Sequence, residues 1–343
     1  MLWPVGGRKA WLIAGSLAAL AATPRGRSVL KGALVLSEVL PSPLHPLSGV
    51  SRGHRARRID LAHGQADFYE ARPGAPGIVL VHGANAAGID DPRVRDLAGA
   101  FCRVGRSVLA PSLVLAERRV DPDDGLRILD AIDALADRAG PVVVVAFSYG
   151  GALAFCALAR RPSIQARVRS LATIGTYFDI VHLIEGVTTG SVCVNGGLYP
   201  WQPPVAALGQ VGPLLGDFLG GRELEVVEQI LANRDPRRTA SLIDELPGDV
   251  RAKLDQVSPA RHVHTIRVPL LALHSRVDPA APAIESAQLV AAVRPRARAR
   301  LTLVGSLNHV TPVGTVLGWM RDAPGLVRFA ASILRAQERW AWV

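Results

Sequence analysis

One stretch, PVVVVAFSYGG at positions 141–151, limits what this chain can fold into more than any other. Its four consecutive valines are β-branched and apolar on both faces of an extended chain, which is typical of a strand in the middle of a parallel sheet. The residues after it have helical apolar spacing. Ser148 therefore lies on a sharp strand-to-helix turn, and the small residues Ala146 and Gly150 let the two backbones approach. The turn predicts a nucleophilic serine, provided that suitable partners occur elsewhere.

Strand and helix signals alternate along most of the chain, which predicts the α/β class: a mostly parallel central sheet with helices on both faces. The domain is expected to run from residue 58 to residue 343, after an N-terminal segment at 1–57. Strands are expected at 59–61, 66–71, 77–81, 107–110, 169–175, 268–273 and 301–304. Helices are expected at 92–104, 123–139, 283–293 and 325–340.

The alternation stops between Thr176 and Thr265. This insertion is rich in glycine, proline and apolar residues, and it then becomes helical at 223–233 and 237–246. We predict that it is a lid that shapes an apolar substrate pocket, in which Thr188-Thr189-Gly190 could touch the substrate. A structural excursion with no such role, and a plain turn at Thr188-Thr189-Gly190, would have the same composition.

Two later strand ends supply the partners that a serine nucleophile needs. A serine hydroxyl requires a base to take its proton and a third group to hold that base in the right tautomer. Asp278 follows the strand at 268–273, and His309 follows the strand at 301–304. Loops at the carboxyl ends of parallel strands meet at one edge of the sheet. We therefore expect Ser148, Asp278 and His309 to form a triad, with Asp179 as an alternative acid.

An oxyanion hole needs two backbone N–H groups aimed at the tetrahedral intermediate. The amide of Tyr149, directly after the nucleophile, is one predicted donor, and the amide of Ala84, in the loop after the strand at 77–81, is the other. We expect His82 to support this loop by hydrogen bonding rather than to act as a base. Asp90 and Asp91 are expected to cap the helix that begins near Pro92.

The net charge of +10 comes almost wholly from arginine, since Lys9, Lys31 and Lys253 are the only lysines. The arginines are scattered over expected helices and are not interleaved with aromatic residues, so we expect no nucleic-acid partner.

Nothing in the sequence indicates a metal or an organic cofactor. The three cysteines are odd in number and widely spaced, which indicates neither a disulfide framework nor a CxxC site. His262 and His264 form a pair, but no carboxylate or cysteine stands at a spacing suited to a metal site. We therefore expect catalysis without a cofactor.

The N-terminal segment holds two apolar stretches, 10–22 and 29–40. The first is short for a membrane-spanning helix and has the length of the apolar part of a signal peptide. Together the stretches predict a cleaved signal, helices on a membrane surface, or helices packed on the domain. The pattern favours membrane association or export over a cytoplasmic location.

The chain order Ser148, Asp278, His309 resembles that of the α/β-hydrolase superfamily, and the resemblance implies the α/β-hydrolase fold with a lid insertion. The stretch at 257–282 is similar to the dienelactone-hydrolase and prolyl-oligopeptidase-like branch, which commonly carries Ser-Pro, an apolar strand and then His-Gly-x-x-Asp-x-x-Pro. The resemblance covers residue 59 to the C-terminus, apart from much of the insertion.

The sequence departs from these relatives at three positions. Ala146 stands where the elbow usually has glycine, and Ser275 replaces the glycine after the strand histidine, but both are small. The nucleophile is Ser148, whereas dienelactone hydrolases use cysteine, so their substrate cannot be carried over. The serine also argues against epoxide hydrolases and haloalkane dehalogenases, which have aspartate there.

Together these features predict a serine hydrolase that cleaves a carboxylic ester or related small acyl substrate through an acyl-enzyme. The same residues could serve a peptidase, thioesterase, lactonase, acyltransferase or C–C hydrolase. A catalytically silent scaffold that binds at a membrane through its N-terminal segment is a further alternative. The sequence predicts neither the acyl group nor the oligomeric state.

Overall fold

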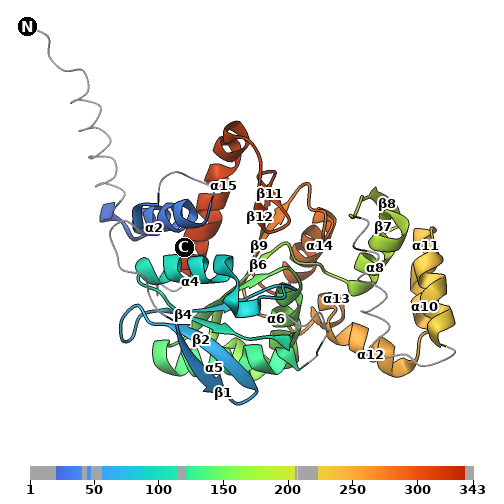
Figure 1. The fold of residues 1–343 in the computed structure, drawn as a ribbon, viewed down its shortest axis with the longest axis horizontal. Helices are drawn as coiled ribbons and strands as arrows, with labels where there is room; N and C mark the ends of the chain where they lie inside the picture. Colours follow the sequence, from blue (N-terminus) through green and yellow to red (C-terminus); the bar gives the residue numbers. More distant parts are fainter. Residues whose placement is uncertain are drawn as a thin grey trace, which may run out of the picture.

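The computed structural model describes residues 21–40, 45–47, 56–114, 121, 123–204, 207 and 223–336. Its centre is an eight-stranded sheet in the order β1-β2-β4-β3-β5-β6-β9-β10 (Figure 1). The six strands from β4 to β10 in this order run parallel, while β2 is antiparallel to β4 and β1 is antiparallel to β2. The strands are β1 (Arg57–Leu61), β2 (Gly64–Tyr69), β3 (Gly77–Val81), β4 (Ser107–Pro111), β5 (Val142–Phe147), β6 (Val168–Ile174), β9 (Leu270–Ser275) and β10 (Ala299–Val304).

The valine run forms the buried strand that its composition predicts. Val142 and Val144 of β5 pack into the apolar cluster that includes α5 (Asp124–Ala139), α6 (Ser148–Arg160) and α14 (Ala283–Val293). Val143 and Val145 point to the other face of the sheet, into the cluster that includes α2 (Pro24–Val39), α4 (Pro92–Arg103) and α15 (Val316–Arg335). Both faces of the sheet are therefore covered by helices, and the predicted three-layer arrangement is confirmed (Figure 1).

The second apolar stretch of the N-terminal segment packs on the domain as α2. Thr23 caps this helix, since its hydroxyl accepts a hydrogen bond from the Gly26 amide at 3.0 Å. Val35 is buried in the same apolar cluster as α4 and α15. Within the described residues no helix combines the length and apolar character needed to cross a membrane. The first apolar stretch lies mostly outside the described residues.

The last helix, α15, begins at Val316, nine residues before the predicted start at 325. Pro324 lies inside the helix rather than before its start. The N-terminus is instead fixed by Thr315, whose hydroxyl accepts a hydrogen bond from the Gly318 amide at 3.2 Å. A threonine cap and packing against α2 outweigh the helix-breaking tendency of one proline.

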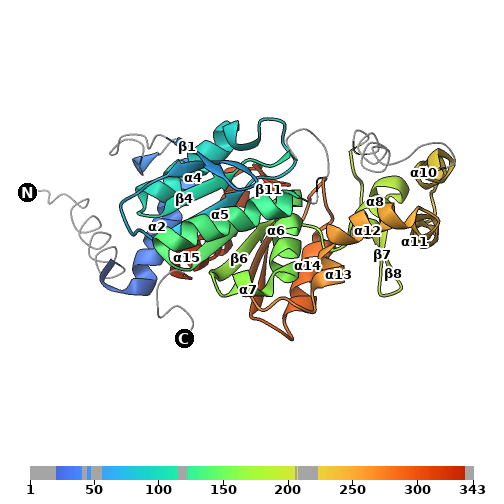
Figure 2. The same ribbon diagram turned by 90° about the horizontal axis from the view of Figure 1, so that it is seen from below.

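The insertion contains an element that the sequence reasoning missed, a hairpin of β7 (Ser191–Val194) and β8 (Gly197–Pro200). Its turn is Asn195-Gly196, with φ of 50° and 80°, as the Asn-Gly signal of a tight hairpin requires. In its described part, the insertion also contains the helices α8 (Ile180–Thr189), α10 (Glu223–Ala232), α11 (Pro236–Asp244), α12 (Gly248–Gln256) and α13 (Pro259–His262). Helices α10 and α11 lie to one side of the main body, away from the sheet (Figure 2).

Candidate active site

Ser148 occupies the strained turn that its neighbours predict. It lies between β5 and α6 with a φ of 51°, a left-handed conformation that is unusual for a non-glycine residue. Side chains at the flanking glycines would block the turn, because an added Cβ at Gly150 would collide with the carbonyl oxygen of His82. At Gly83 an added Cβ would lie 3.0 Å from the Cβ of Ser148. The small residues thus allow β5, α6 and the loop after β3 to approach one another closely.

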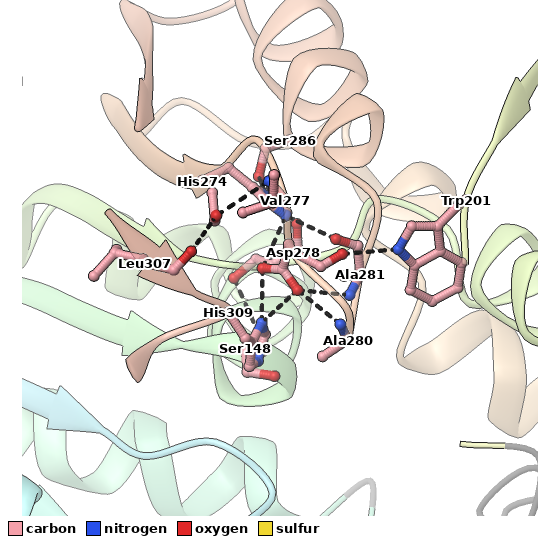
Figure 3. Close-up of polar contacts among 12 residues, drawn as sticks. Ser148, Trp201, His274, Val277, Asp278, Ala280, Ala281, Ser286, Leu307 and His309 are labelled. Atoms are coloured by element: carbon pink, nitrogen blue, oxygen red, sulfur yellow. Dashed lines mark hydrogen bonds and ion pairs between the residues drawn. The ribbon is translucent and has the colours of Figure 1, made fainter. Parts of the chain in front are cut away.

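His309 and Asp278 form a close pair at the ends of neighbouring strands (Figure 3). The Nδ1 atom of His309 lies 2.8 Å from Oδ2 and 3.0 Å from Oδ1 of Asp278. An ionised carboxylate only accepts hydrogen bonds, so Nδ1 carries the proton and Nε2 has a free lone pair. This is the tautomer that a general base for Ser148 requires.

The Asp278 carboxylate is buried and held by several donors. Its Oδ1 accepts hydrogen bonds from the amides of Ala280 at 2.8 Å and Ala281 at 3.0 Å. Burial favours its protonation, but the hydrogen bonds from His274 and His309 prevail and hold the pKa of Asp278 well below its usual range. Asp278 is therefore an ionised carboxylate at neutral pH.

His274 is a supporting residue to which the sequence reasoning gave no role. Its side chain is completely buried, and its Nε2 lies 3.0 Å from the Ala281 carbonyl and 3.3 Å from Oδ2 of Asp278. Both partners are acceptors, so Nε2 carries a proton and His274 donates toward the acid. The other ring nitrogen lies 2.7 Å from the Ser286 hydroxyl. In the sequence, the only signal for this role is the position of His274 four residues before Asp278, in the stretch that resembles the His-Gly-x-x-Asp pattern.

Gly175 and Thr176, at the end of β6, also shape the site without having been predicted. Gly175 has a φ of 65°, and an added Cβ there would lie 2.9 Å from both Nδ1 and Cε1 of His309. The hydroxyl of Thr176 donates to the Ser148 carbonyl at 3.1 Å. Gly175 thus leaves room for the imidazole, and Thr176 fixes the turn that carries Ser148.

The predicted oxyanion donors lie at the same end of the sheet. Tyr149 is in the first turn of α6, where backbone N–H groups have no partner within the helix and the helix dipole favours negative charge. Its side chain is buried against Tyr177, with ring centroids 5.8 Å apart, so only its backbone can face a substrate. Ala84 lines the same cavity as Ser148.

His82 is placed as expected from the sequence, bonded to the loop after β3 that carries Gly83 and Ala84. Its Nε2 lies 3.3 Å from the amide of Leu113 and accepts that hydrogen bond, so its Nδ1 donates to the Gly83 carbonyl at 2.8 Å. Burial lowers the pKa of His82, which keeps the ring neutral. Of the two predicted caps, Asp91 caps α4, accepting from the Arg93 amide at 2.8 Å. The Asp90 carboxylate does not, since it instead accepts hydrogen bonds from Arg58 and Arg95.

The alternative acid, Asp179, is occupied elsewhere. Its carboxylate caps α8, accepting from the Val181 amide and the Ser258 hydroxyl, each at 3.0 Å. Its amide donates to the buried carboxylate of Glu285 at 2.9 Å. Asp179 therefore anchors the insertion to the domain, and Asp278 is the carboxylate that meets His309.

Two other predicted candidates have structural partners. Thr188 and Thr189 end α8, and their hydroxyls donate to the carbonyl of Glu185 in the preceding turn, at 3.2 and 2.7 Å. His262 donates to the Asp255 carbonyl at 2.9 Å. Among the described residues, no cluster of histidine, cysteine and carboxylate side chains is suited to hold a metal ion.

A cavity of about 390 Å³ opens at Ser148 and His309. It runs between the sheet and the helices α2, α4 and α15, and its wall is mostly apolar. No described residue of the insertion lines it. The part of the insertion that the structure describes instead supports the acid from behind, because Nε1 of Trp201 donates to the Asp278 carbonyl at 2.8 Å (Figure 3). Residues 205–206 and 208–222 are not described, so the lid stays a prediction.

The comparisons with known proteins agree with this architecture. The sequence matches no protein-family model and no curated protein. The structure is similar to Pyrococcus horikoshii acylaminoacyl peptidase, with a TM-score of 0.53 and 14% identity over 86% of this chain and 43% of that one. It is also similar to a Mycobacterium tuberculosis puromycin-hydrolyzing peptidase, with a TM-score of 0.52 and 19% identity over 88% of this chain and 41% of that one. This chain has the α/β-hydrolase fold.

The structure is also similar to that of a shorter protein with which it aligns over most of both chains. A putative esterase from Staphylococcus aureus aligns with a TM-score of 0.51 and 16% identity, over 83% of this chain and 85% of its own length. The chain thus spans about two fifths of each peptidase but corresponds to most of the esterase. The predicted α/β-hydrolase fold class is confirmed.

Proposed function

We propose that this protein is a serine hydrolase that cleaves a carboxylic ester or a related acyl compound through an acyl-enzyme intermediate. The observation that carries the proposal is the Asp278–His309 hydrogen bond beside Ser148, at the mouth of an apolar cavity. A buried carboxylate that fixes the Nδ1–H tautomer of a histidine, together with a serine in a strained turn, is the arrangement needed for nucleophilic acyl transfer.

In the acylation step, Oγ of Ser148 bonds to the acyl carbon while its proton moves to Nε2 of His309. Asp278 stays ionised and stabilises the resulting imidazolium through Nδ1–H. The negative charge on the former carbonyl oxygen is held by the amides of Tyr149 and Ala84. When the tetrahedral intermediate collapses, the bond to the alcohol oxygen breaks, and His309 gives its proton to the leaving alcohol.

In the deacylation step, water takes the place of the alcohol. His309 removes a proton from the water as its oxygen attacks the acyl-enzyme, and Oγ of Ser148 leaves with that proton. The products are a carboxylic acid and the free enzyme. Apart from the substrate and water, each step uses only groups of this chain.

Labelling with a fluorophosphonate probe tests the proposal. The wild-type protein should become covalently labelled and hydrolyse p-nitrophenyl acetate, whereas Ser148→Ala should do neither. Ser170→Ala is a matched control, because Ser170 lies in the neighbouring strand β6 and is buried away from the cavity. Equal labelling of wild type and Ser148→Ala would contradict the assignment of Ser148 as the nucleophile. No labelling of either protein would contradict the proposal and favour a silent scaffold.

A further inference from the structure

The cavity extends from the reacting groups into the apolar layer of the protein. At its mouth lie Ser148, His309 and the polar side chains of Asn85 and Arg93. Further in, side chains such as Leu80 of the sheet form its floor. A cavity that connects a nucleophile to an apolar interior can hold one part of a substrate while the scissile bond stays at the mouth.

The chemistry of the deeper wall selects a hydrocarbon chain. It is formed by leucine, isoleucine, valine, alanine and phenylalanine side chains of α2, α4, α15 and the sheet. A peptide or a sugar placed there would lose hydrogen bonds to water and find no partners in return. An alkyl chain needs none, and burial of each methylene group contributes about 0.8 kcal/mol, or roughly fourfold in an equilibrium or rate constant.

The size of the cavity limits the length of that chain. A cavity of about 150 Å³ holds benzene, so by proportion 390 Å³ holds roughly 15 carbon atoms. Part of this space, at the mouth, is taken by the ester group itself. The remaining volume suits an acyl chain of roughly 8 to 12 carbons.

One wall comes from the N-terminal segment. Val35, Leu36 and Val39 of α2 line the cavity, and their spacing places them along one side of the helix. Leu40, which caps the end of this helix, also lines the cavity. The wall is packed tightly onto the domain, since an added Cβ at Gly32 would lie 2.9 Å from the backbone nitrogen of Ala331 in α15. The segment that precedes the hydrolase domain in sequence is therefore part of its substrate pocket.

We infer that the protein acts on esters of medium-chain fatty acids, of roughly 8 to 12 carbons, and that α2 sets the chain length. The inference rests on the proposed function, because it assumes that Ser148 is acylated. It assigns the acyl half of the substrate to the cavity and makes Leu36 and Val39 determinants of chain length.

A series of p-nitrophenyl esters from acetate to dodecanoate, kept below micellar concentrations, tests the chain length. The value of kcat/KM should rise by about fourfold per methylene group and level off near roughly 10 carbons. Leu36→Trp should shift the best chain length down by roughly 4 carbons. It should also lower the ratio of kcat/KM for decanoate to kcat/KM for acetate at least about tenfold. Leu34→Trp is the matched control on the same helix, since Leu34 is partly buried but does not line the cavity.

Binding of decanoic acid to Ser148→Ala, measured by calorimetry, tests the pocket without requiring catalysis. Saturable binding that Leu36→Trp weakens and Leu34→Trp does not would support the acyl-chain pocket. If such binding were seen but no ester were cleaved, the proposed hydrolase function would fail while the inferred pocket would stand. A flat ester series together with no binding would overturn the inference while leaving an acetate esterase intact. A chain preference seen only in alkyl acetates, in the alcohol half, would overturn the assignment to the acyl group.

Discussion

Replacing Gly175 with alanine should disable catalysis through one misplaced methyl group. The new Cβ would lie 2.9 Å from Nδ1 and Cε1 of His309 and 3.4 Å from Oδ2 of Asp278. Because nonbonded carbon atoms prefer separations of about 3.5 to 4.0 Å, the imidazole must move by about 0.6 to 1.1 Å. A displacement of about 1 Å in a reacting group can cost about 100-fold in rate. We expect kcat/KM to fall about 100-fold.

The same substitution should also lower the free energy of unfolding, because φ at Gly175 is 65°. Alanine in this left-handed region costs roughly 1–2 kcal/mol. Gly74→Ala is the matched control, since its φ is 70° and an added Cβ would meet no atom within 4 Å. Urea denaturation should show similar losses for both variants, while ester hydrolysis should fall only for Gly175→Ala. If Gly175→Ala kept activity within about threefold of wild type, the steric argument would be wrong.

Two further predictions concern Asp278. Because its folded-state pKa lies below the unfolded value of about 4, the ionised carboxylate stabilises the fold above about pH 4, and this contribution is lost as pH falls through the folded pKa. The difference in melting temperature between wild type and Asp278→Asn should therefore shrink below about pH 4, and a constant difference from pH 7 to pH 3 would contradict the assignment. His274→Leu removes a donor to Asp278 and should lower kcat about tenfold with KM unchanged. His274→Gln keeps an N–H donor and should recover most of the lost kcat. Equal losses of kcat in both variants would indicate that His274 has a packing role only.

Local chemistry accounts for the parts of the fold that sequence reasoning predicted correctly. Strand β3 and helix α14 have the predicted bounds, because their apolar periodicity and their flanking turn residues are strong local signals. The cap at Asp91 was predictable for the same reason. The start of α15 was not, since Pro324 is a local signal that packing of the helix against α2 overrides.

In the candidate site, too, some features could be predicted from the sequence and others could not. The positions of Ser148, Asp278 and His309 could be predicted because the strands of a parallel sheet end at one edge, so residue types that follow strands can be grouped without knowing any contact. The contributions of His274 and Gly175 could not, because each depends on which side chain of another strand lies a few ångströms away. No periodicity in the sequence encodes such a distance.

By itself, then, the sequence determined the parallel sheet, the strand-to-helix turn at Ser148 and the order of the three candidate catalytic residues, which all follow from local patterns and the rules of parallel sheets. Only the tertiary structure decided what surrounds them. The insertion, expected to shape the pocket, contributes Trp201 behind the acid in its described part, whereas α2 forms a wall of the cavity. Helix α2 can form this wall because helices from opposite ends of the chain pack together, α2 against α15. Such a contact is set by complementary shape and buried area, and neither can be deduced from one segment alone.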